Sequence, residues 1–446
     1  MNRRAFLQGA VGAGATLTAA ACGGTSSTCP SPGSSGSGSS CAAGLPGGDY
    51  FSQLSQDLSE AGLGTPQILI DLDRLDANAD AIVAGVRAER YRIVEKSLPS
   101  LDLLDYVRTR TGSDRFMVMH LPFLPAILAR FPAAQVLIGK PQPIAAVKQF
   151  FAGVPAADLP GVVGRVRFLA DTAGRLDELL ALATTLAVPL QVAVEIDVGL
   201  HRGGVRRPGG LPEVLSRFVA NPTLVSFAGM LGYDGHVAST PSPPGLEEPA
   251  ARASFKTAEA TYQSFVDVLT SQFASLVRDD LVFNSGSSAT YPLYTSGPVN
   301  DVAAGGGMLR PASYANTFIG ALSPAVFIAA PVLAHFDKVE LPLVTNLTQT
   351  WTSEQQGFTV YGGGWAAEFV WPEGIDLAPL VNDAENENLV PNQSWMIGPA
   401  KPALGPGDWI FQHPRVADAI FQFESILLVR GGRLQPEHWR AFPRRY

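Results

Sequence analysis

One lysine stands where an amine could bond covalently to a carbonyl compound. Lys96 is one of only six lysines in the chain, and it ends the β-type run YRIVEK at residues 91–96. A lysine at the mouth of a buried strand is partly shielded from water, which favours its neutral, nucleophilic form. Such an amine forms a Schiff base with an aldehyde cofactor. An ordinary surface lysine at a strand end is the alternative, so this prediction needs support from other residues.

A turn of small residues follows a later strand. Residues 283–291 read FNSGSSATY, and they include Ser287 and Ser288. Small residues allow backbone N–H groups to converge on an anion, and the serine hydroxyls add further donors. The run predicts a phosphate-binding loop, with a plain Ser/Gly turn as the alternative.

Two further strand ends carry groups suited to a heteroaromatic ligand. Residues 195–204 place Asp197 and Arg202 in one turn, where a fixed guanidinium can hold a phenolate oxygen. Residues 229–236 supply Tyr233 and His236, whose rings can stack on a heteroaromatic ring. A structural salt bridge or a buried ring would explain each of these groups taken alone.

The composition excludes several other chemistries. The chain has 446 residues, of which 46% are hydrophobic and 16% charged, and this balance favours large packed cores over disorder. A formal net charge of −8 gives no electrostatic footprint for nucleic acid or anionic lipid. The three cysteines, Cys22, Cys29 and Cys41, all lie near the N-terminus. We therefore expect no thiol nucleophile, disulfide or thiolate metal site in the body of the protein.

The candidate residues need a scaffold that gathers strand ends, and the chain pattern predicts one. Short β-type runs alternate with helical stretches at 73–88, 100–110 and 175–187. The expected strands are residues 67–72, 91–95, 115–119, 135–138, 165–169, 190–196, 224–230 and 281–283, with a further short segment that enters residues 309–310. Alternation at this spacing is typical of a parallel sheet. About eight such units over residues 66–320 predict an α/β fold, a (β/α)8 TIM-type barrel whose active site lies at the C-terminal strand ends.

The rhythm changes after about residue 320. Strands separated by Gly/Pro turns are expected at 339–350, 358–361, 409–412 and 425–429, which predicts a mostly β C-terminal domain. We therefore divide the chain into a signal at 1–22, a Gly/Ser/Pro-rich tether at 23–50, the barrel at 51–320 and the β domain at 321–446.

The N-terminal region predicts export. Arg3 and Arg4 precede Phe6, as in twin-arginine signals, and a small-residue stretch ends at Cys22, as in lipoprotein processing sites. We expect an exported protein, periplasmic or at the cell surface, whose only link to a membrane is a lipid anchor at Cys22. An ordinary signal with a nearby cysteine is the alternative.

Taken together and in order, these segments resemble the fold-type III pyridoxal-phosphate enzymes that include alanine racemase, and most closely the D-serine dehydratase and D-threonine aldolase branch. Residues 65–73 look like that family's opening strand, and Lys96 lies where the family has its cofactor lysine. Residues 195–202 look like its acidic-Gly-Arg turn. Residues 286–291 and 309–314 look like its phosphate loop and its Arg-Pro-Gly-x-Tyr segment. The resemblance covers nearly all of residues 60–446.

The resemblance implies pyridoxal 5'-phosphate as cofactor and Lys96 as the residue that forms the Schiff base with it. Arg202 would contact the phenolic oxygen, and Tyr233 or His236 would lie against the ring. It also implies a small amino-acid substrate and a homodimer, with the second face of the cofactor served by the C-terminal domain.

The resemblance further implies that Ser287 and Ser288 hold the phosphate and that Tyr314 lines the pocket. His413, in the C-terminal domain, is the candidate acid–base group for the second face.

The same histidine marks a departure from the related enzymes. The dehydratases and aldolases bind a metal through a His-x-Cys or His-x-Asp pair near the C-terminus, whereas here Arg415 follows His413 at the second-ligand position. Arginine cannot ligate a cation. Asp418 could replace it only if the loop folds back, so His413 and Asp418 are candidate metal ligands and a metal-free site is the favoured alternative.

The expected function is a pyridoxal-phosphate lyase or deaminase, of dehydratase or aldolase type, acting on a small D- or β-hydroxy amino acid. A racemase is the second hypothesis, because it needs acid–base groups on both faces and no metal. A surface binding lipoprotein without catalysis is the third.

Overall fold

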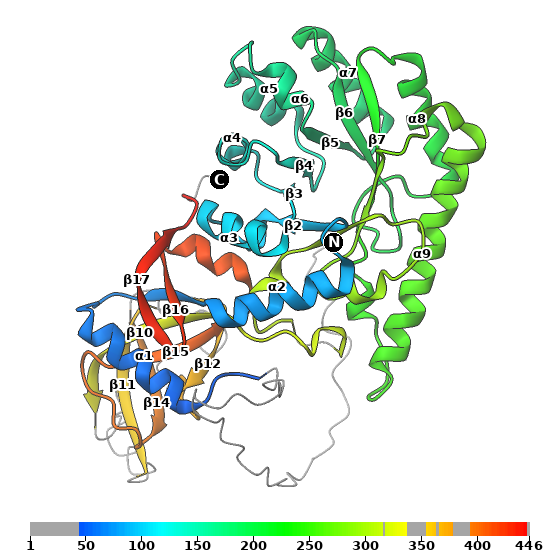
Figure 1. The fold of residues 1–446 in the computed structure, drawn as a ribbon. Helices are drawn as coiled ribbons and strands as arrows, with labels where there is room; N and C mark the ends of the chain where they lie inside the picture. The colour runs from blue at the N-terminus through cyan, green and yellow to red at the C-terminus, as the bar shows by residue number, and fades with distance from the viewer. Residues whose placement is uncertain (1–43, 315–316, 337–353, 363–364, 378–392, 444–446) are drawn as a thin grey trace, which may run out of the picture. The chain divides into compact units, whose positions relative to one another are not determined.

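The computed structural model describes residues 44–314, 317–336, 354–362, 365–377 and 393–443. Their strands form a closed eight-stranded parallel barrel and a nine-stranded, mostly antiparallel sheet (Figure 1). This arrangement confirms the predicted fold class. The barrel strands are β2 (Tyr91–Val94), β3 (Arg115–Val118), β4 (Gln135–Ile138), β5 (Val166–Ala170), β6 (Leu190–Glu195), β7 (Val225–Gly232), β8 (Val282–Ser285) and β9 (Asp301–Ala304).

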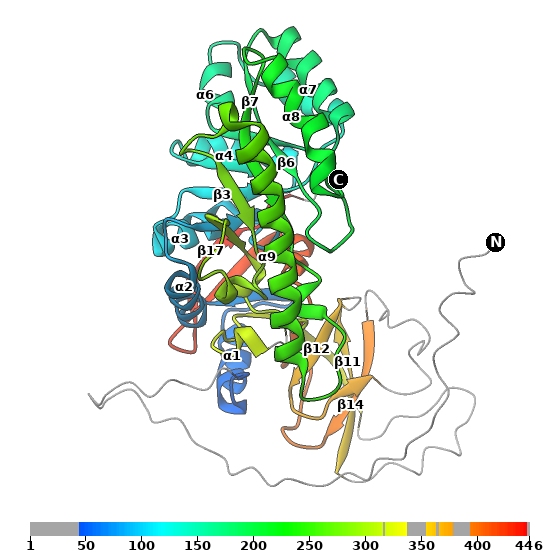
Figure 2. The same cartoon turned by 90° about the vertical axis from the view of Figure 1, so that its right-hand side faces the viewer.

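Helices alternate with the barrel strands, and side-chain caps fix where several of them begin. Asp71 accepts the N–H groups of Asp73 and Arg74 at the start of α2, and Ser100 and Thr172 cap α3 and α7. Long α9 runs beside α8 (Figure 2). The helices are α1 (Gly48–Glu60), α2 (Leu72–Val86), α3 (Leu101–Thr111), α4 (Leu124–Arg130), α5 (Ile144–Ala152), α6 (Leu159–Val163), α7 (Ala173–Leu186), α8 (Leu211–Ala220) and α9 (Glu247–Gln272).

The barrel interior is filled by one apolar side chain from each strand. Because successive side chains on a strand point to opposite faces, the residues on either side of these positions face the helices instead. The lumen ring consists of Val94, Met117, Leu137, Leu169, Ala193, Leu231, Val282 and Ala303. Residues two positions further along each strand must therefore line the C-terminal mouth.

Below the lumen ring lies a buried ion pair. The Arg92 guanidinium donates to both carboxylate oxygens of Asp301, at 2.6 and 2.8 Å, and neither side chain is exposed. Arg92 also donates to the carbonyls of Phe116 and Gln135, so its charge is satisfied across three strands. The end of the barrel opposite the mouth is thus closed by paired polar groups.

The first strand of the chain does not belong to the barrel. The prediction that residues 67–72 open the barrel is wrong, because β1 (Gln67–Asp71) lies in the separate sheet. There it pairs antiparallel with β10 (Val326–Phe336) and parallel with β16 (Ser425–Arg430). The eighth barrel strand is instead β9, which pairs with β2 and closes the ring. The segment expected at residues 309–310 follows η8 (Gly306–Met308) and is not a strand. Apolar β1 resembles a barrel strand in sequence, whereas β9 begins with the charged residue Asp301.

The sheet contains the C-terminal strands and is covered by α1, which contacts β15 and β17 (Figure 1). The predicted strands at 358–361, 409–412 and 425–429 fall within β11, β15 and β16, and the one at 339–350 lies outside the described residues. Besides β1 its strands are β10 (Val326–Phe336), β11 (Gln355–Tyr361), β12 (Ala367–Trp371), β13 (Asp376–Leu377), β14 (Gln393–Pro399), β15 (Trp409–Pro414), β16 (Ser425–Arg430) and β17 (Arg433–Arg440). In the described part of the chain, no helix has the length and apolar character needed to cross a membrane.

Candidate active site

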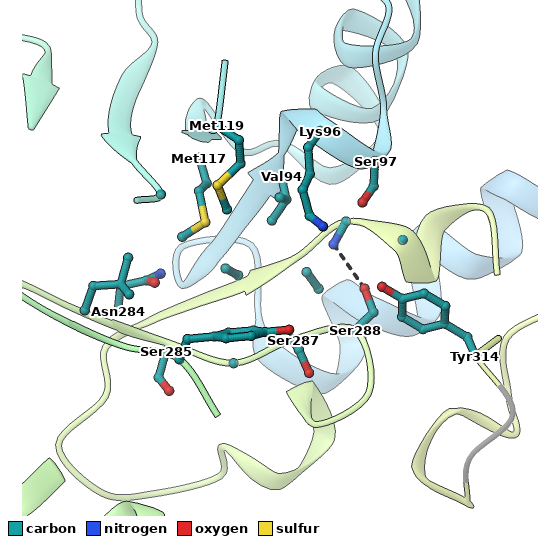
Figure 3. A pocket seen from close by; sticks show the side chains of 18 of the residues that line it. Val94, Lys96, Ser97, Met117, Met119, Asn284, Ser285, Ser287, Ser288 and Tyr314 are labelled. Atoms are coloured by element: carbon teal, nitrogen blue, oxygen red, sulfur yellow. Dashed lines mark hydrogen bonds between the residues drawn. The ribbon is translucent and has the colours of Figure 1, made fainter. Parts of the chain in front are cut away.

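A pocket opens at the C-terminal ends of the barrel strands, immediately above the lumen ring (Figure 3). It encloses about 610 Å³ of empty space, the solvent at its mouth included. This volume lies within the usual range for small-molecule sites. The lining residues include Lys96, Met117, Met119, Gly139, Arg202, Tyr233, Asn284, Ser287, Ser288, Gly305, Gly306 and Tyr314. Six of the predicted cofactor contacts therefore lie around one cavity.

Lys96 projects into this pocket from η2 (Glu95–Ser97), the single 3-10 turn that follows β2. It lies two residues beyond Val94 of the lumen ring, which places it on the inner side of the barrel mouth. Figure 3 shows the Lys96 amine and the Ser288 and Tyr314 hydroxyls turned toward the same space. The amine is thus accessible to a ligand held in the pocket.

Two loops after neighbouring strands form a cradle of backbone amides. Residues 286–288 follow β8 and residues 305–307 follow β9, and most of these residues line the pocket. The Ser288 hydroxyl oxygen accepts the N–H groups of Gly305, at 3.1 Å, and Gly307, at 2.7 Å, and so joins the two loops. Loops after the seventh and eighth strands are the usual phosphate site of such barrels. The sequence prediction found Ser287 and Ser288 but missed residues 305–307, although three consecutive glycines marked them.

Glycines allow the loops of the cradle to pack closely against their neighbours. A Cβ atom on Gly305 would lie 2.7 Å from the Cβ of Val94, and one on Gly306 would lie 2.6 Å from the Tyr314 hydroxyl. Gly286 has a φ of +92°, in the region that favours glycine. These residues fit a phosphate-bearing cofactor, since serine hydroxyls and the backbone of two glycine-containing loops line the same pocket as Lys96.

Arg202 and Tyr233 form one wall of the pocket. The Arg202 guanidinium lies 4.5 Å from the centre of the Tyr233 ring and 3.5 Å from Glu195. Burial raises the pKa of Glu195, and the charge of Arg202 offsets part of that rise. A structural salt bridge between Arg202 and Asp197, the alternative explanation of this turn, is absent from the described contacts, in which Asp197 binds His201 and Arg206. Arg202 therefore reaches the pocket from beside a different carboxylate.

Tyr314 forms the opposite wall and packs against Gly306. Burial and the nearby Tyr233 and Asp418 raise the pKa of Tyr314 to about 12, although a hydrogen bond with Ser288 lowers it in part. The phenol therefore keeps its proton at neutral pH and can donate it.

Three predicted residues do not line the pocket. His236 lies beside Gly199, where an added Cβ would meet its Nε2 at 2.8 Å, and Asp418 lies in η11 (Ala417–Gln422). His413 is the penultimate residue of β15, and its Nε2–H donates to the Arg310 carbonyl at 2.9 Å. Burial lowers the pKa of His413, which favours the neutral ring. The described residues contain no cluster of three or more His, Cys, Asp or Glu side chains that would suit a metal ion.

A buried carboxyl group bonded to Tyr294 allows the effect of burial on stability to be tested. Asp234 is fully buried, its Oδ2 accepts the Tyr294 hydroxyl at 2.7 Å, and its Oδ1 has no hydrogen-bond partner within the described ranges. Burial raises the pKa of Asp234, and hydrogen bonds with Thr290 and Tyr294 offset part of the rise. The raised pKa of Asp234 therefore lowers the stability of the folded protein at pH values above the carboxyl group's unfolded pKa. This loss of stability grows as pH rises toward the folded pKa.

We therefore expect Asp234→Asn to raise the thermal midpoint relative to wild type, by a difference that grows between pH 4 and pH 8. Asp301→Asn is the opposite case. Burial, the largest influence, would raise the pKa of Asp301, but the charges of Arg92 and Arg115 and the hydrogen bonds from Arg92 and Asn284 together outweigh it and the pKa is lowered. That variant should lose stability at neutral pH, and a loss of the same size in Asp234→Asn would contradict the assignment.

A parallel barrel with a lysine and a phosphate-type cradle at its C-terminal mouth, joined to a β sheet, defines the class of fold-type III pyridoxal-phosphate enzymes. The chain belongs to the family described as alanine racemase, N-terminal domain, which matches residues 70–309. Enzymes of this family depend on pyridoxal phosphate. A search of curated protein sequences found no significant match.

Solved structures with the same fold include three enzymes. D-threo-3-hydroxyaspartate dehydratase from Delftia sp. HT23 is 18% identical, with a TM-score of 0.62 over 86% of this chain and 98% of that one. D-threonine aldolase from Filomicrobium marinum is 17% identical, with a TM-score of 0.62 over 85% and 97%. Alanine racemase from Bacillus anthracis is 13% identical, with a TM-score of 0.59 over 85% and 98%. At these identities the likeness extends to the fold alone.

Proposed function

We propose that this protein is a pyridoxal-phosphate-dependent lyase or deaminase, of dehydratase or aldolase type, that acts on a small D- or β-hydroxy amino acid. The observation that carries the proposal is that Lys96 and the cradle at 286–288 and 305–307 open into one pocket. Two of the similar solved structures, a dehydratase and an aldolase, carry names of that reaction type.

When bound, the cofactor supplies an electron sink for bonds at the substrate's α-carbon. The chain would supply the rest. Lys96 would anchor the cofactor and then hold and move a proton at its Nζ atom. Residues of the cradle would bind the phosphate, and Arg202 would hold the phenolic oxygen. The Tyr314 phenol, protonated at neutral pH, would donate from the other wall.

A racemase is the second candidate, and one observation favours it. A racemase needs an acid–base group on each side of the substrate, and both Lys96 and Tyr314 line the pocket. A surface binding protein without catalysis is a third reading, which a purified protein that stays colourless with added pyridoxal phosphate would support.

The decisive experiment for the reaction is a substrate screen of the protein loaded with pyridoxal phosphate. D-serine, D-threonine and D-alanine are incubated separately, and keto acid, aldehyde and optical rotation are measured. A lyase yields keto acid or aldehyde, whereas loss of rotation without either product identifies a racemase. Absence of all three signals in a coloured protein would contradict both enzyme proposals for these substrates.

We further propose that the reaction needs no divalent metal. The support is that Arg415 occupies the second-ligand position and that the Nε2 of His413 donates to a carbonyl oxygen. Activity is therefore expected to survive dialysis against EDTA with less than about a twofold loss, because no positive charge essential to the transition state is removed. A large loss restored by Zn²⁺ or Mn²⁺ would contradict this.

The assembly and location are proposals as well. We propose a homodimer, as is frequent among related enzymes, and export with lipidation at Cys22, which lies outside the described residues. Light scattering on the purified protein tests the first. Detergent partitioning of the full chain and of Cys22→Ala tests the second.

A further inference from the structure

The residue before Lys96 is a fully buried carboxylate. Glu95 has no exposed side-chain surface, and both of its oxygens are engaged. Oε2 accepts the backbone N–H of Met119 at 3.0 Å, and Oε1 accepts the Nδ1–H of His120 at 3.0 Å. A carboxylate can only accept, so this contact places the His120 proton on Nδ1. Glu95 thus joins the turn that carries Lys96 to the segment just after β3, whose Met119 lines the same pocket.

The partner of Glu95 is itself held by rings from two parts of the chain. The His120 ring lies edge-on to Phe123, at 5.6 Å, and to Phe421, at 5.6 Å. Phe123 stacks at 4.3 Å on Phe442, which follows the last strand. His120, Phe123, Phe421 and Phe442 form an aromatic clamp between the barrel and the C-terminal segments. Rings packed in this way restrict the rotation of the imidazole.

The clamp also holds the chain beyond Lys96. The N–H of Phe442 donates to the carbonyl of Pro99 at 2.7 Å, and Ser100 begins α3 by capping the N–H of Leu103. Lys96 is thus the exposed member of a turn whose neighbours on both sides are tied down, before it by Glu95 and after it by Pro99. A side chain with four rotatable bonds needs such a fixed base if its amine is to meet a ligand in one geometry.

We propose that the buried Glu95–His120 pair is the positioning element of Lys96, and that the Glu95 carboxylate sets the electrostatic environment in which the Lys96 nitrogen carries its proton. The inference rests on the proposed function, because it assigns Glu95 a role toward the residue that would hold the cofactor. Glu95 and His120 are positioning residues, since neither lines the pocket.

Other charged and titratable groups also face the Lys96 turn and contribute to its field. Arg202 and Tyr233 lie across the pocket mouth, Tyr314 forms the far wall, and Asp418 lies close enough to Tyr314 to raise its pKa. Unlike these groups, Glu95 is a fully buried carboxylate next to Lys96 in the chain, so water screens its charge less than it screens theirs.

The test uses the full-length protein loaded with pyridoxal phosphate, and it follows the visible band of the bound cofactor as a function of pH. In Glu95→Gln the amide keeps an acceptor for Met119 but removes the charge. Loss of a nearby negative charge disfavours a protonated nitrogen. The midpoint of the band is therefore expected to move to lower pH by at least about half a unit. Capture of added pyridoxal phosphate by the apoprotein should slow about tenfold, because the amine is less well placed.

Two further variants separate position from charge. His120→Gln keeps the Glu95 carboxylate but weakens the hydrogen bond that fixes its position. Capture of pyridoxal phosphate should therefore slow, while the midpoint of the band stays within about 0.2 pH units of wild type. Glu95→Asp keeps the charge and should restore most of the midpoint. If Glu95→Gln fails to fold, the capture rate of His120→Gln decides, and an unchanged rate overturns the proposal.

A buried carboxylate elsewhere provides the matched control. Asp57 is buried in α1 and accepts from Arg433 and the N–H of Leu434, a donor set like that of Glu95. Asp57→Asn should lower the thermal midpoint without moving the band. An unshifted midpoint in Glu95→Gln, or an equal shift in Asp57→Asn, overturns this inference while leaving the proposed function intact. A wild-type protein that stays colourless overturns the proposed function, and this inference with it.

Discussion

Replacing Lys96 with alanine is expected to abolish both the yellow colour of the protein loaded with pyridoxal phosphate and its turnover. Lys96 is the lysine that lines the pocket among the described residues, so its loss removes the amine that would bond to the cofactor's aldehyde. Turnover should fall by at least about 10³-fold, since the same nitrogen would hold the transferred proton. Visible absorbance and steady-state kinetics measure the two effects.

The fold should survive this substitution. Lys96 is exposed, and the turn around it is held by Glu95 rather than by the lysine side chain. The free energy of unfolding should therefore change by no more than about 0.5 kcal/mol, as is usual for a substitution at an exposed position. The thermal midpoint should stay correspondingly close to that of the wild type. Lys140→Ala is the matched control, because Lys140 is also exposed and also follows a barrel strand, but it does not line the pocket. Colour retained in Lys96→Ala, or lost in Lys140→Ala, would contradict the assignment.

Adding a side chain at Gly305, in the cradle, is expected to have the second-largest effect on cofactor binding. In Gly305→Val the new Cβ would lie 2.7 Å from the Cβ of Val94, which precedes the Lys96 turn, and 3.3 Å from that of Ser97, the last residue of the turn. The loop must shift, and it would carry away the N–H that Ser288 accepts. We expect at least about a 100-fold loss in affinity for pyridoxal phosphate, since a displacement of about 1 Å has an effect of that order. Equilibrium titration of the visible band measures it.

The same substitution should also destabilise the protein by about 1–3 kcal/mol, the usual effect of overpacking a filled interior. Gly209→Val is the control, because a Cβ on Gly209 meets nothing within 4 Å and its backbone is not in the left-handed region. If Gly305→Val bound the cofactor as tightly as Gly209→Val, the cradle would not be the phosphate site.

Most of the pocket was predictable because its residues follow strand ends. Lys96, Tyr233 and Ser287 each lie within two residues of a strand end, Arg202 lies in the loop after β6, and parallel strands bring such ends to one mouth. The period of two along each strand explains more. Met119, Gly139 and Gly305 each lie two residues beyond a member of the lumen ring, and each lines the pocket. Met119 and Gly305 were not predicted as site residues, because a methionine or glycine side chain has no group that could itself do chemistry.

What could not be predicted depended on partners far away in the chain. Residues 67–71 are as apolar as a barrel strand, and only their pairing with β10 and β16 places them in the sheet. Asp301 looks like a loop residue until Arg92 is placed against it. His413 was expected at the site because of its place in a motif, yet its ring turns to the Arg310 carbonyl. In each case the local pattern was compatible with two environments, and a long-range contact chose between them.

The position of β1 in the sheet also has a consequence for how the chain folds. Ile68, near the start of the described chain, pairs with Ile426, near its end. All the barrel strands therefore lie, in the sequence, between two strands that are neighbours in the sheet. During synthesis β1 emerges first and cannot complete its sheet until β16 has left the ribosome. Pairings of such high sequence separation form slowly, and they expose strand edges meanwhile. The barrel is therefore expected to assemble first and the sheet to close last, which makes β1 the segment most in need of protection while the chain is incomplete.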